Sequence, residues 1–322
     1  MNIINSIIGV ILLVILVIIG YKLGQIIIEL NSPVTPVINE TKLTLPLQPS
    51  SNTTLRWNHF PLTVYIDSSS VKSEYVDNFR ESLELWQSST DNFVSFFVVT
   101  SIDADITVEW VPRLKENSTD ALGNTDLKFI NISGVGLIQN AKIELLTKSD
   151  SRQLSRIDMT NLALHEIGHA LGLSHSSNEE DIMYPILTIP SNAIKEISAT
   201  DLQELQKSYA QPAKPDLRIA EVNVTKATLK RFGTTFYLVD ISMIIENVGL
   251  TDAASVVLEI DTENEKVKQE NLPSMDVGNK LSVIFGNVRV NNEFSTIKLV
   301  LDSANLIDEL NEENNFVMLK VT

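Results

Sequence analysis

The sequence predicts an α+β domain followed by an all-β sandwich, with an apolar N-terminal helix ahead of both. The first residues are almost wholly apolar, the middle of the chain alternates between strand and helix periodicity, and the last hundred residues contain only strand-like runs. A chain of 322 residues is too long for a single hydrophobic core. Prolines near residue 213 mark the boundary, so we expect domains at 56–210 and 216–322 joined by a linker at 211–215.

Residues 1–30 are predicted to be a transmembrane anchor. No charged side chain occurs from Met1 to Tyr21, and Ile7 to Gly20 is almost wholly Ile, Leu and Val. With its flanks, this stretch is long enough to cross a hydrocarbon core about 30 Å thick. A cleaved signal peptide is the rival interpretation, although the basic n-region and the small-x-small cleavage site are missing. We therefore expect a single-pass membrane protein with its domains outside the cell, or a secreted protein if the segment is removed.

Residues 31–55 are rich in Pro, Ser, Thr and Asn and show no clear periodicity, which predicts an extended linker. The chain carries 25 Lys and Arg against 41 Asp and Glu, a net charge of −16. Because no basic run is available to contact a phosphate backbone, nucleic acid is not an expected partner. The chain has no cysteine, so a metal ion must be held by nitrogen and oxygen ligands.

The middle domain has the periodicities of a sheet that carries two long helices. Apolar and polar residues alternate over 62–67, as in a strand with one buried face. Apolar residues then recur at helical spacing over 75–86. Strand character returns in three runs, at 93–100, 104–111 and 134–147. Two further helices are predicted through 156–173 and 201–209, which completes an α+β layer.

The stretch HEIGHALGLSH, residues 165–175, holds three of the four histidines in the chain. His165 and His169 are four residues apart, so on a helix they share one face and can reach one ion. Gly172 is the residue type best able to end the helix in a left-handed conformation. The chain can then turn sharply and bring His175 to the same ion.

Three nitrogen ligands leave one coordination position open, which is typical of a catalytic zinc. Glu166 is rotated by about a quarter turn from the ligands and would lie beside the ion. Zinc would lower the pKa of a bound water to about 7, and Glu166 would accept its proton as general base. A chance cluster is the alternative, but composition alone produces the full pattern in roughly one chain in a million.

HEIGHALGLSHS, residues 165–176, resembles the metzincin signature HExxHxxGxxH in its matrixin form, the form of the matrix metalloproteinases. DIMYP, residues 181–185, resembles the Met-turn of that family, which implies that Met183 lies beneath the histidines. The similarity extends from about Trp57 to Tyr209. It implies an α+β metzincin catalytic domain, with a twisted mixed sheet and two long helices, that cleaves protein or peptide substrates with one zinc ion.

The resemblance also implies where a substrate would lie. It would run extended along an edge strand near 122–138 by backbone pairing. Tyr184, Pro185 and the loop to about Pro190 would form the pocket for the residue after the scissile bond. A calcium ion in the loop from Asn124 to Gly136 is a further hypothesis.

The sequence departs from the family pattern in two respects. The family's zymogen is often held by a cysteine that caps the zinc, and no cysteine is present here. The additional histidines that bind a structural zinc in many matrixins are also missing. His59 is the only histidine outside the motif, and we interpret it as a core or surface residue.

The C-terminal domain contains six strand-like runs separated by turns, which favours an antiparallel β-sandwich. The start PDL, the stretch ENVG at 246–249 and the stretch DSANLIDELNEENN at 302–315 resemble the CARDB domain. This is an immunoglobulin-like module of prokaryotic surface proteins, so it implies a binding or spacing role with a surface-protein partner. The acidic residues of the last stretch could bind calcium, but a solvated surface is the expectation for them; they are Asp302, Asp308, Glu309, Glu312 and Glu313.

The sequence as a whole predicts a membrane-anchored or secreted zinc metalloendopeptidase with an appended β-sandwich. The alternative is a surface adhesion protein whose functional part is the sandwich and whose zinc site is structural or degenerate.

Overall fold

The computed structural model describes residues 17–22, 35–41, 53–114, 121–149, 152–231 and 234–321. Of the predicted transmembrane segment, only 17–22 falls within these ranges, and it is helical. No helix in the described ranges is both long and apolar enough to cross a membrane. Most of the predicted anchor lies outside the described residues, so the anchor stays a prediction.

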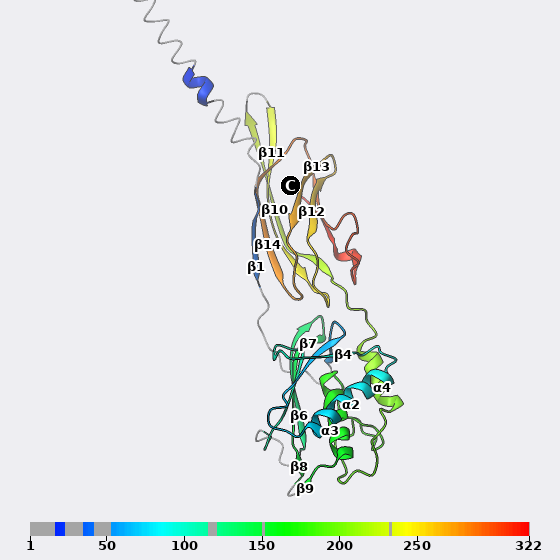
Figure 1. Ribbon diagram of the computed structural model, residues 1–322. Coiled ribbons are helices and arrows are strands. Elements are labelled where there is room, and N and C mark those ends of the chain that lie inside the picture. The colour runs from blue at the N-terminus through cyan, green and yellow to red at the C-terminus, as the bar shows by residue number, and fades with distance from the viewer. Residues whose placement is uncertain are drawn as a thin grey trace, which may run out of the picture.

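A six-stranded sheet forms one half of the middle domain, with β6 at one edge and β4 at the other (Figure 1). Neighbouring strands are parallel except for β6, which pairs antiparallel with β7. The strands are β2 (Thr54–Arg56), β3 (Leu62–Ile66), β4 (Phe96–Val99), β5 (Ile106–Trp110), β6 (Gly123–Ile132) and β7 (Val135–Leu145). A short hairpin of β8 (Lys148–Ser149) and β9 (Arg152–Gln153) follows.

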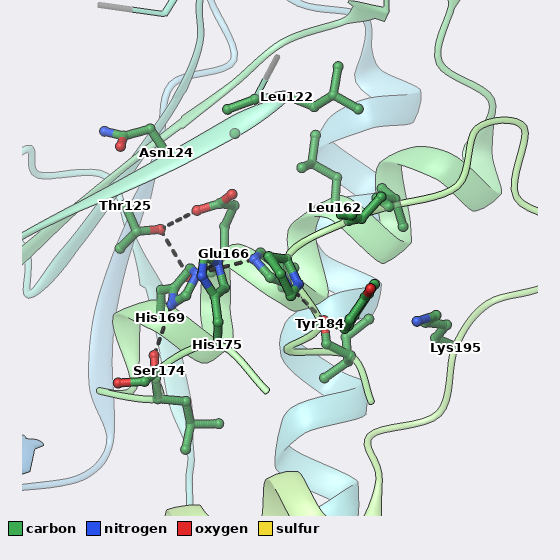
Figure 2. Close-up of a pocket in the computed structure, with 18 of the residues that line it drawn as sticks. Leu122, Asn124, Thr125, Leu162, Glu166, His169, Ser174, His175, Tyr184 and Lys195 are labelled. Carbon is green, nitrogen blue, oxygen red and sulfur yellow. Dashed lines mark hydrogen bonds between the residues drawn. The ribbon is translucent and has the colours of Figure 1, made fainter. Parts of the chain in front are cut away.

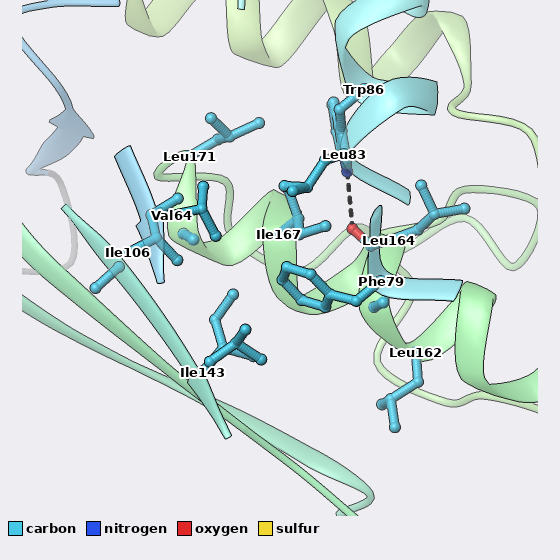
Figure 3. Close-up of a cluster of buried hydrophobic side chains, with 14 of the residues drawn as sticks. Val64, Phe79, Leu83, Trp86, Ile106, Ile143, Leu162, Leu164, Ile167 and Leu171 are labelled. Carbon is cyan, nitrogen blue, oxygen red and sulfur yellow. Dashed lines mark hydrogen bonds between the residues drawn. The ribbon is translucent and has the colours of Figure 1, made fainter. Parts of the chain in front are cut away.

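Two long helices supply the other half of the core. They are α2 (Ser73–Ser89) and α3 (Arg156–Ala170), and a shorter helix α4 (Ala199–Ser208) follows. Phe79 and Trp86 of α2 pack against Leu164 and Ile167 of α3, and all four are fully buried (Figure 3). The indole of Trp86 also donates a hydrogen bond of 2.9 Å to the Leu164 carbonyl. The prediction of a mixed α and β domain is thus confirmed.

Capping boxes explain where α3 and α4 begin. The Ser155 hydroxyl accepts from the Asp158 amide while the Asp158 carboxylate accepts from the Ser155 amide, and Ser198 and Asp201 repeat the arrangement. Each pair satisfies backbone groups that a helix N-terminus leaves without partners. The prediction that α4 begins near residue 201 was therefore late by two residues.

The prediction of a loop from Asn124 to Gly136, where a calcium ion could bind, is wrong, because the segment is not a loop. These residues form β6, a two-residue turn at Ser133 and Gly134, and the start of β7. The ladder with β7 uses only one side of the β6 backbone, so it does not decide whether calcium binds. The calcium ion stays a hypothesis without the loop that was predicted for it.

The C-terminal domain is a sandwich of two four-stranded antiparallel sheets, ordered β1-β14-β11-β10 and β13-β12-β15-β16. Its strands are β10 (Leu217–Arg231), β11 (Thr234–Asn247), β12 (Val256–Thr262), β13 (Lys266–Leu272), β14 (Lys280–Val290), β15 (Thr296–Leu301) and β16 (Phe316–Lys320), with a 3-10 turn at Glu312–Asn314. Apolar residues of both sheets meet in a separate buried core. The predicted all-β sandwich is confirmed.

The predicted linker at 31–55 needs a correction, because it contributes a strand to this sandwich. Strand β1 (Val37–Thr41) pairs antiparallel with β14 from Val37 opposite Ile284 to Thr41 opposite Lys280. Ile38 packs against the sandwich core. The metzincin-like domain is therefore inserted between one edge strand of the sandwich and the remaining seven strands. The other predicted domain boundaries stay predictions.

We expect Ile38→Asp to detach β1 from the sandwich. Placing a carboxylate on the partly buried core-facing side removes about 1–2 kcal/mol of apolar burial. Hydrogen exchange of the β14 amides from 280 to 284 should speed up. Val37→Asp is the matched control, because the Val37 side chain is 55% exposed on the same strand. Equal effects of the two substitutions would contradict the contribution of Ile38.

Candidate metal centre

Three histidine rings converge at the end of α3 (Figure 2). His165 and His169 project from the same face of the helix, one turn apart. The Nε2 atom of His169 lies 3.1 Å from Nε2 of His165 and 3.2 Å from Nε2 of His175. A tetrahedral zinc with bonds of about 2.0–2.1 Å sets its nitrogen ligands roughly 3.3 Å apart. Both separations thus match those of a zinc site, and the ligand atoms of the three histidines all lie within 4.8 Å of one another.

Hydrogen bonds at the Nδ1 atoms fix the tautomers of the His165 and His169 rings. Nδ1 of His165 lies 2.8 Å from the Ile182 carbonyl, and Nδ1 of His169 lies 2.8 Å from the Leu173 carbonyl. A carbonyl only accepts, so each Nδ1 carries the hydrogen and each Nε2 presents a lone pair. Lone pairs this close repel unless a cation lies between them. The residues therefore fit a metal ion.

Burial keeps these rings neutral. It lowers the pKa of His169 to about 4 and also lowers the pKa of His165. Neutral imidazole is the form that binds metal, so both side chains are ready as ligands at neutral pH. Among the described residues, His165, His169 and His175 are the one group of three His, Cys, Asp or Glu side chains close enough to share an ion.

Gly172 makes the turn that the sequence predicted. Its φ is +97°, in the region that favours glycine. The Leu173 amide donates back to the Gly168 carbonyl at 3.0 Å, which closes the helix end. A Cβ at Gly172 would also lie 2.2 Å from the Leu55 carbonyl oxygen of β2. The position therefore needs glycine both for its backbone conformation and for its close contact with the sheet.

Glu166 lies beside the histidines and is buried against β6 (Figure 2). The Thr125 hydroxyl donates a 2.6 Å hydrogen bond to its Oε2 atom. Burial raises the pKa of the Glu166 carboxyl to about 7, against the opposing effect of the Thr125 hydrogen bond. Gly123 makes room for the carboxyl, because a Cβ there would lie 2.4 Å from Oε1.

Met183 packs against α3, the helix that carries His165 and His169. The absent side chain of Gly168 leaves the space, since a Cβ there would lie 2.2 Å from the Met183 sulfur. The Ser176 amide donates to the Met183 carbonyl at 2.8 Å, and its hydroxyl donates to Asp181 at 2.5 Å. These bonds join the segment that carries His175 to the turn that carries Met183.

The helix α4 also holds this turn. Asp201 of its capping box accepts a 3.1 Å hydrogen bond from the Ile182 amide. The carbonyl of Ile182 in turn faces Nδ1 of His165. The cap of one helix thus orients a ring on another.

A cleft of about 1050 Å³ runs over the three rings. One wall is β6 with the residues before it, and the other is the segment from Ile182 to Leu187. Its lining includes the three histidines and Glu166, together with Leu122, Thr125, Leu162, Tyr184, Pro185 and Lys195. In the described part of the chain β6 pairs only with β7, so its outer edge is available to an extended peptide.

Sequence reasoning missed several residues of this site. Gly123, Thr125 and Gly168 gain their roles only from contacts with residues far along the chain or across the helix. His59, the fourth histidine, is half exposed and lies 3.4 Å from Asp105, outside the cluster. It is a surface residue, one of the two places predicted for it.

Comparisons with known proteins agree with this geometry. The family model described as Matrixin matches residues 56–210, and the CARDB model matches residues 214–318. Human (Homo sapiens) matrix metalloproteinase-26 is 29% identical over 50% of this chain and 62% of its own length. Rattus norvegicus stromelysin-1 is 26% identical over 51% and 35%, and Arabidopsis thaliana metalloendoproteinase 2-MMP is 43% identical over 16% and 14%.

The chain therefore spans less than two thirds of the length of these relatives. The two family matches follow the order of the two folded units in the structure. The chain carries a matrixin-like metzincin domain followed by a C-terminal CARDB domain.

Proposed function

We propose that this protein is a zinc-dependent endopeptidase in which His165, His169 and His175 hold the ion and Glu166 is the general base. The observation that carries the proposal is the convergence of three Nε2 atoms, two with their Nδ1 atoms committed to carbonyls. Structural zinc sites take four protein ligands, whereas three ligands at the floor of a cleft leave a position for a reactant. The names of the relatives, metalloproteinase and metalloendoproteinase, point to the same chemistry.

A bound zinc ion supplies a Lewis acid that polarises a carbonyl and acidifies a water molecule. The protein binds the peptide by backbone pairing along the outer edge of β6. Because Thr125 donates to Oε2 of Glu166, we assign proton transfer to Oε1. That atom takes a proton from the attacking water and passes it to the leaving amine. A carboxyl with a pKa of about 7 suits both steps near neutral pH.

The remaining site residues act through position. Met183 fills the space beside Gly168 and supports the ligand helix from below. Gly172 turns the chain toward His175. Tyr184 and Pro185 line the cleft beyond the histidines, where they form the wall for the side chain that follows the scissile bond.

We further propose that residues 1–30 anchor the protein in a membrane with the domains at 56–210 and 216–322 outside the cell. The support is the uncharged apolar run from Ile7 to Gly20. The CARDB domain then spaces the peptidase or binds a surface partner. N-terminal sequencing of native protein separates retention of this segment from secretion after cleavage.

Chelation tests the peptidase activity. The purified full-length chain should cleave an unfolded protein such as casein, lose this activity with 1,10-phenanthroline and regain it with added zinc. Zinc content measured on the same samples should be one ion per chain. Bound zinc without chelator-sensitive cleavage would favour the adhesion alternative, in which the zinc site is structural.

A further inference from the structure

The two longest strands of the sandwich form a hairpin that projects beyond its neighbours (Figure 1). Strand β14 reaches only to Val290, which pairs with Tyr237 of β11. The pairing of β10 with β11 continues for three more residues, to Arg231 opposite Thr234. At about 3.3 Å per residue, the hairpin extends roughly 10 Å past β14.

This hairpin is basic in a strongly acidic chain. Between Glu221 and Asp240 there are three basic residues and no acidic one, whereas the whole chain has a net charge of −16. Lys230 is exposed near the end of β10. Arg289 of β14 adds a guanidinium that lies 4.4 Å from the ring centre of Phe236.

Acidic side chains also occur at this end of the sandwich, and three of them accept hydrogen bonds from backbone amides. Glu265 accepts hydrogen bonds from the amides of Asn291 and Asn292, and Glu263 accepts from Ser295 and Thr296. Asp240 accepts from the Asn287 amide. Glu293 is exposed in the loop after β14. The hairpin residues past Val290 include Lys230 and Arg231, the apolar Leu229 and Phe236, and no acidic residue.

The direction of β1 places the N-terminal segment at the same end. Strand β1 runs antiparallel to β14, whose residue 290 is near the hairpin tip and whose residue 280 is far from it. The chain before Val37 therefore lies toward the tip, and the chain after Thr41 leaves toward Leu217. The metzincin-like domain is at that opposite end (Figure 1).

Chain length brings the proposed anchor and the tip to the same level. Val37 lies opposite Ile284. Six residue steps along β14 lead from Ile284 to Val290, and three more along β11 lead from Tyr237 to Thr234 at the tip. These nine steps span about 30 Å. The seven steps from Val37 back to residue 30 span at most about 25 Å. If the chain before Val37 continues in the direction of β1, the membrane that holds residues 1–30 lies no farther from Val37 than the hairpin tip does.

We propose that the tip of the β10–β11 hairpin docks on an anionic phospholipid surface. The inference rests on the membrane anchor in the proposed function. Lys and Arg near a membrane are attracted to anionic headgroups, and aromatic side chains favour the interface. The anchor and the tip then make two contacts with the bilayer, which orient the sandwich and hold the cleft at its far end.

The absence of cysteine allows a direct test with single labels. The full-length Thr234→Cys variant, labelled with a polarity-sensitive dye, is reconstituted in vesicles of phosphatidylcholine with 30% phosphatidylglycerol containing brominated lipid. The Ser255→Cys variant reports the opposite end. We expect quenching and a blue shift at position 234 only. Adding Lys230→Glu and Arg231→Glu should reduce the quenched population by roughly tenfold or more.

Each outcome has a defined meaning. Equal quenching at 234 with and without the charge reversals, or in phosphatidylcholine alone, would overturn recognition of anionic lipid. A label that responds to soluble polyglutamate but not to vesicles would assign the tip to an acidic protein and overturn the proposal. Release of the chain from vesicles by carbonate extraction would refute the anchor and with it the length argument, while leaving casein cleavage intact as a separate readout.

Discussion

Glu166→Gln is expected to lower kcat/KM for peptide cleavage by about 10²- to 10⁴-fold while zinc stays bound. The amide keeps the shape of the side chain and the acceptor for Thr125, but it cannot take a proton. The rings of His165 and His169 remain in place because their orientation depends on Ile182, Leu173 and α3. His175 stays in place because the Ser176 amide next to it is bonded to the Met183 carbonyl. The variant should therefore keep its zinc content while its rate of cleavage of a fluorogenic peptide falls.

Thr125→Val is the companion to this substitution. It removes the 2.6 Å hydrogen bond to Oε2 and leaves the proton-accepting group itself intact. Because the hydrogen bond lowers the pKa of Glu166, its loss should shift the acidic limb of the pH profile upward with a smaller loss of rate. Retained cleavage in Glu166→Gln, or loss of its zinc, would remove Glu166 from the role of general base.

The convergence of the three histidines could be predicted from the sequence because its geometry is local. A spacing of four residues fixes two rings on one helix face, and a glycine seven residues after the first histidine permits the turn to His175. The residues around Glu166 could not be predicted in this way. Gly123 and Thr125 reach it only through the register of β6 against β7 and the packing of that hairpin on α3.

Strand β1 shows the same limit on a larger scale. Five residues with mixed polarity carry little periodicity, and their partner strand lies about 240 residues later in the sequence. Edge pairing depends mainly on the backbone, which the side-chain pattern hardly records. The apolar N-terminal segment, in contrast, is conspicuous in sequence, because its length and lack of charge alone predict a membrane span. That span stays a prediction.

Gly172→Ala should destabilise the metzincin-like domain by about 2–4 kcal/mol. Two effects add: a side chain at φ +97° is strained by about 1 kcal/mol, and the new Cβ would lie 2.2 Å from the Leu55 carbonyl oxygen, which forces β2 and the helix end apart. Gly134→Ala is the matched control, because its φ is +89° and nothing lies within 4 Å of its Cβ position.

Urea unfolding monitored by tryptophan fluorescence measures both changes, since all three tryptophans lie in this domain. Gly134→Ala should lower the free energy of unfolding only by the roughly 1 kcal/mol that backbone strain costs. The difference between the two variants then measures the contact with β2. Because Gly172 also delivers His175, its substitution should weaken zinc binding, whereas Gly134→Ala should leave zinc affinity unchanged. Equal losses of unfolding free energy in the two variants would mean that backbone conformation alone, without the contact to Leu55, explains the glycine at position 172.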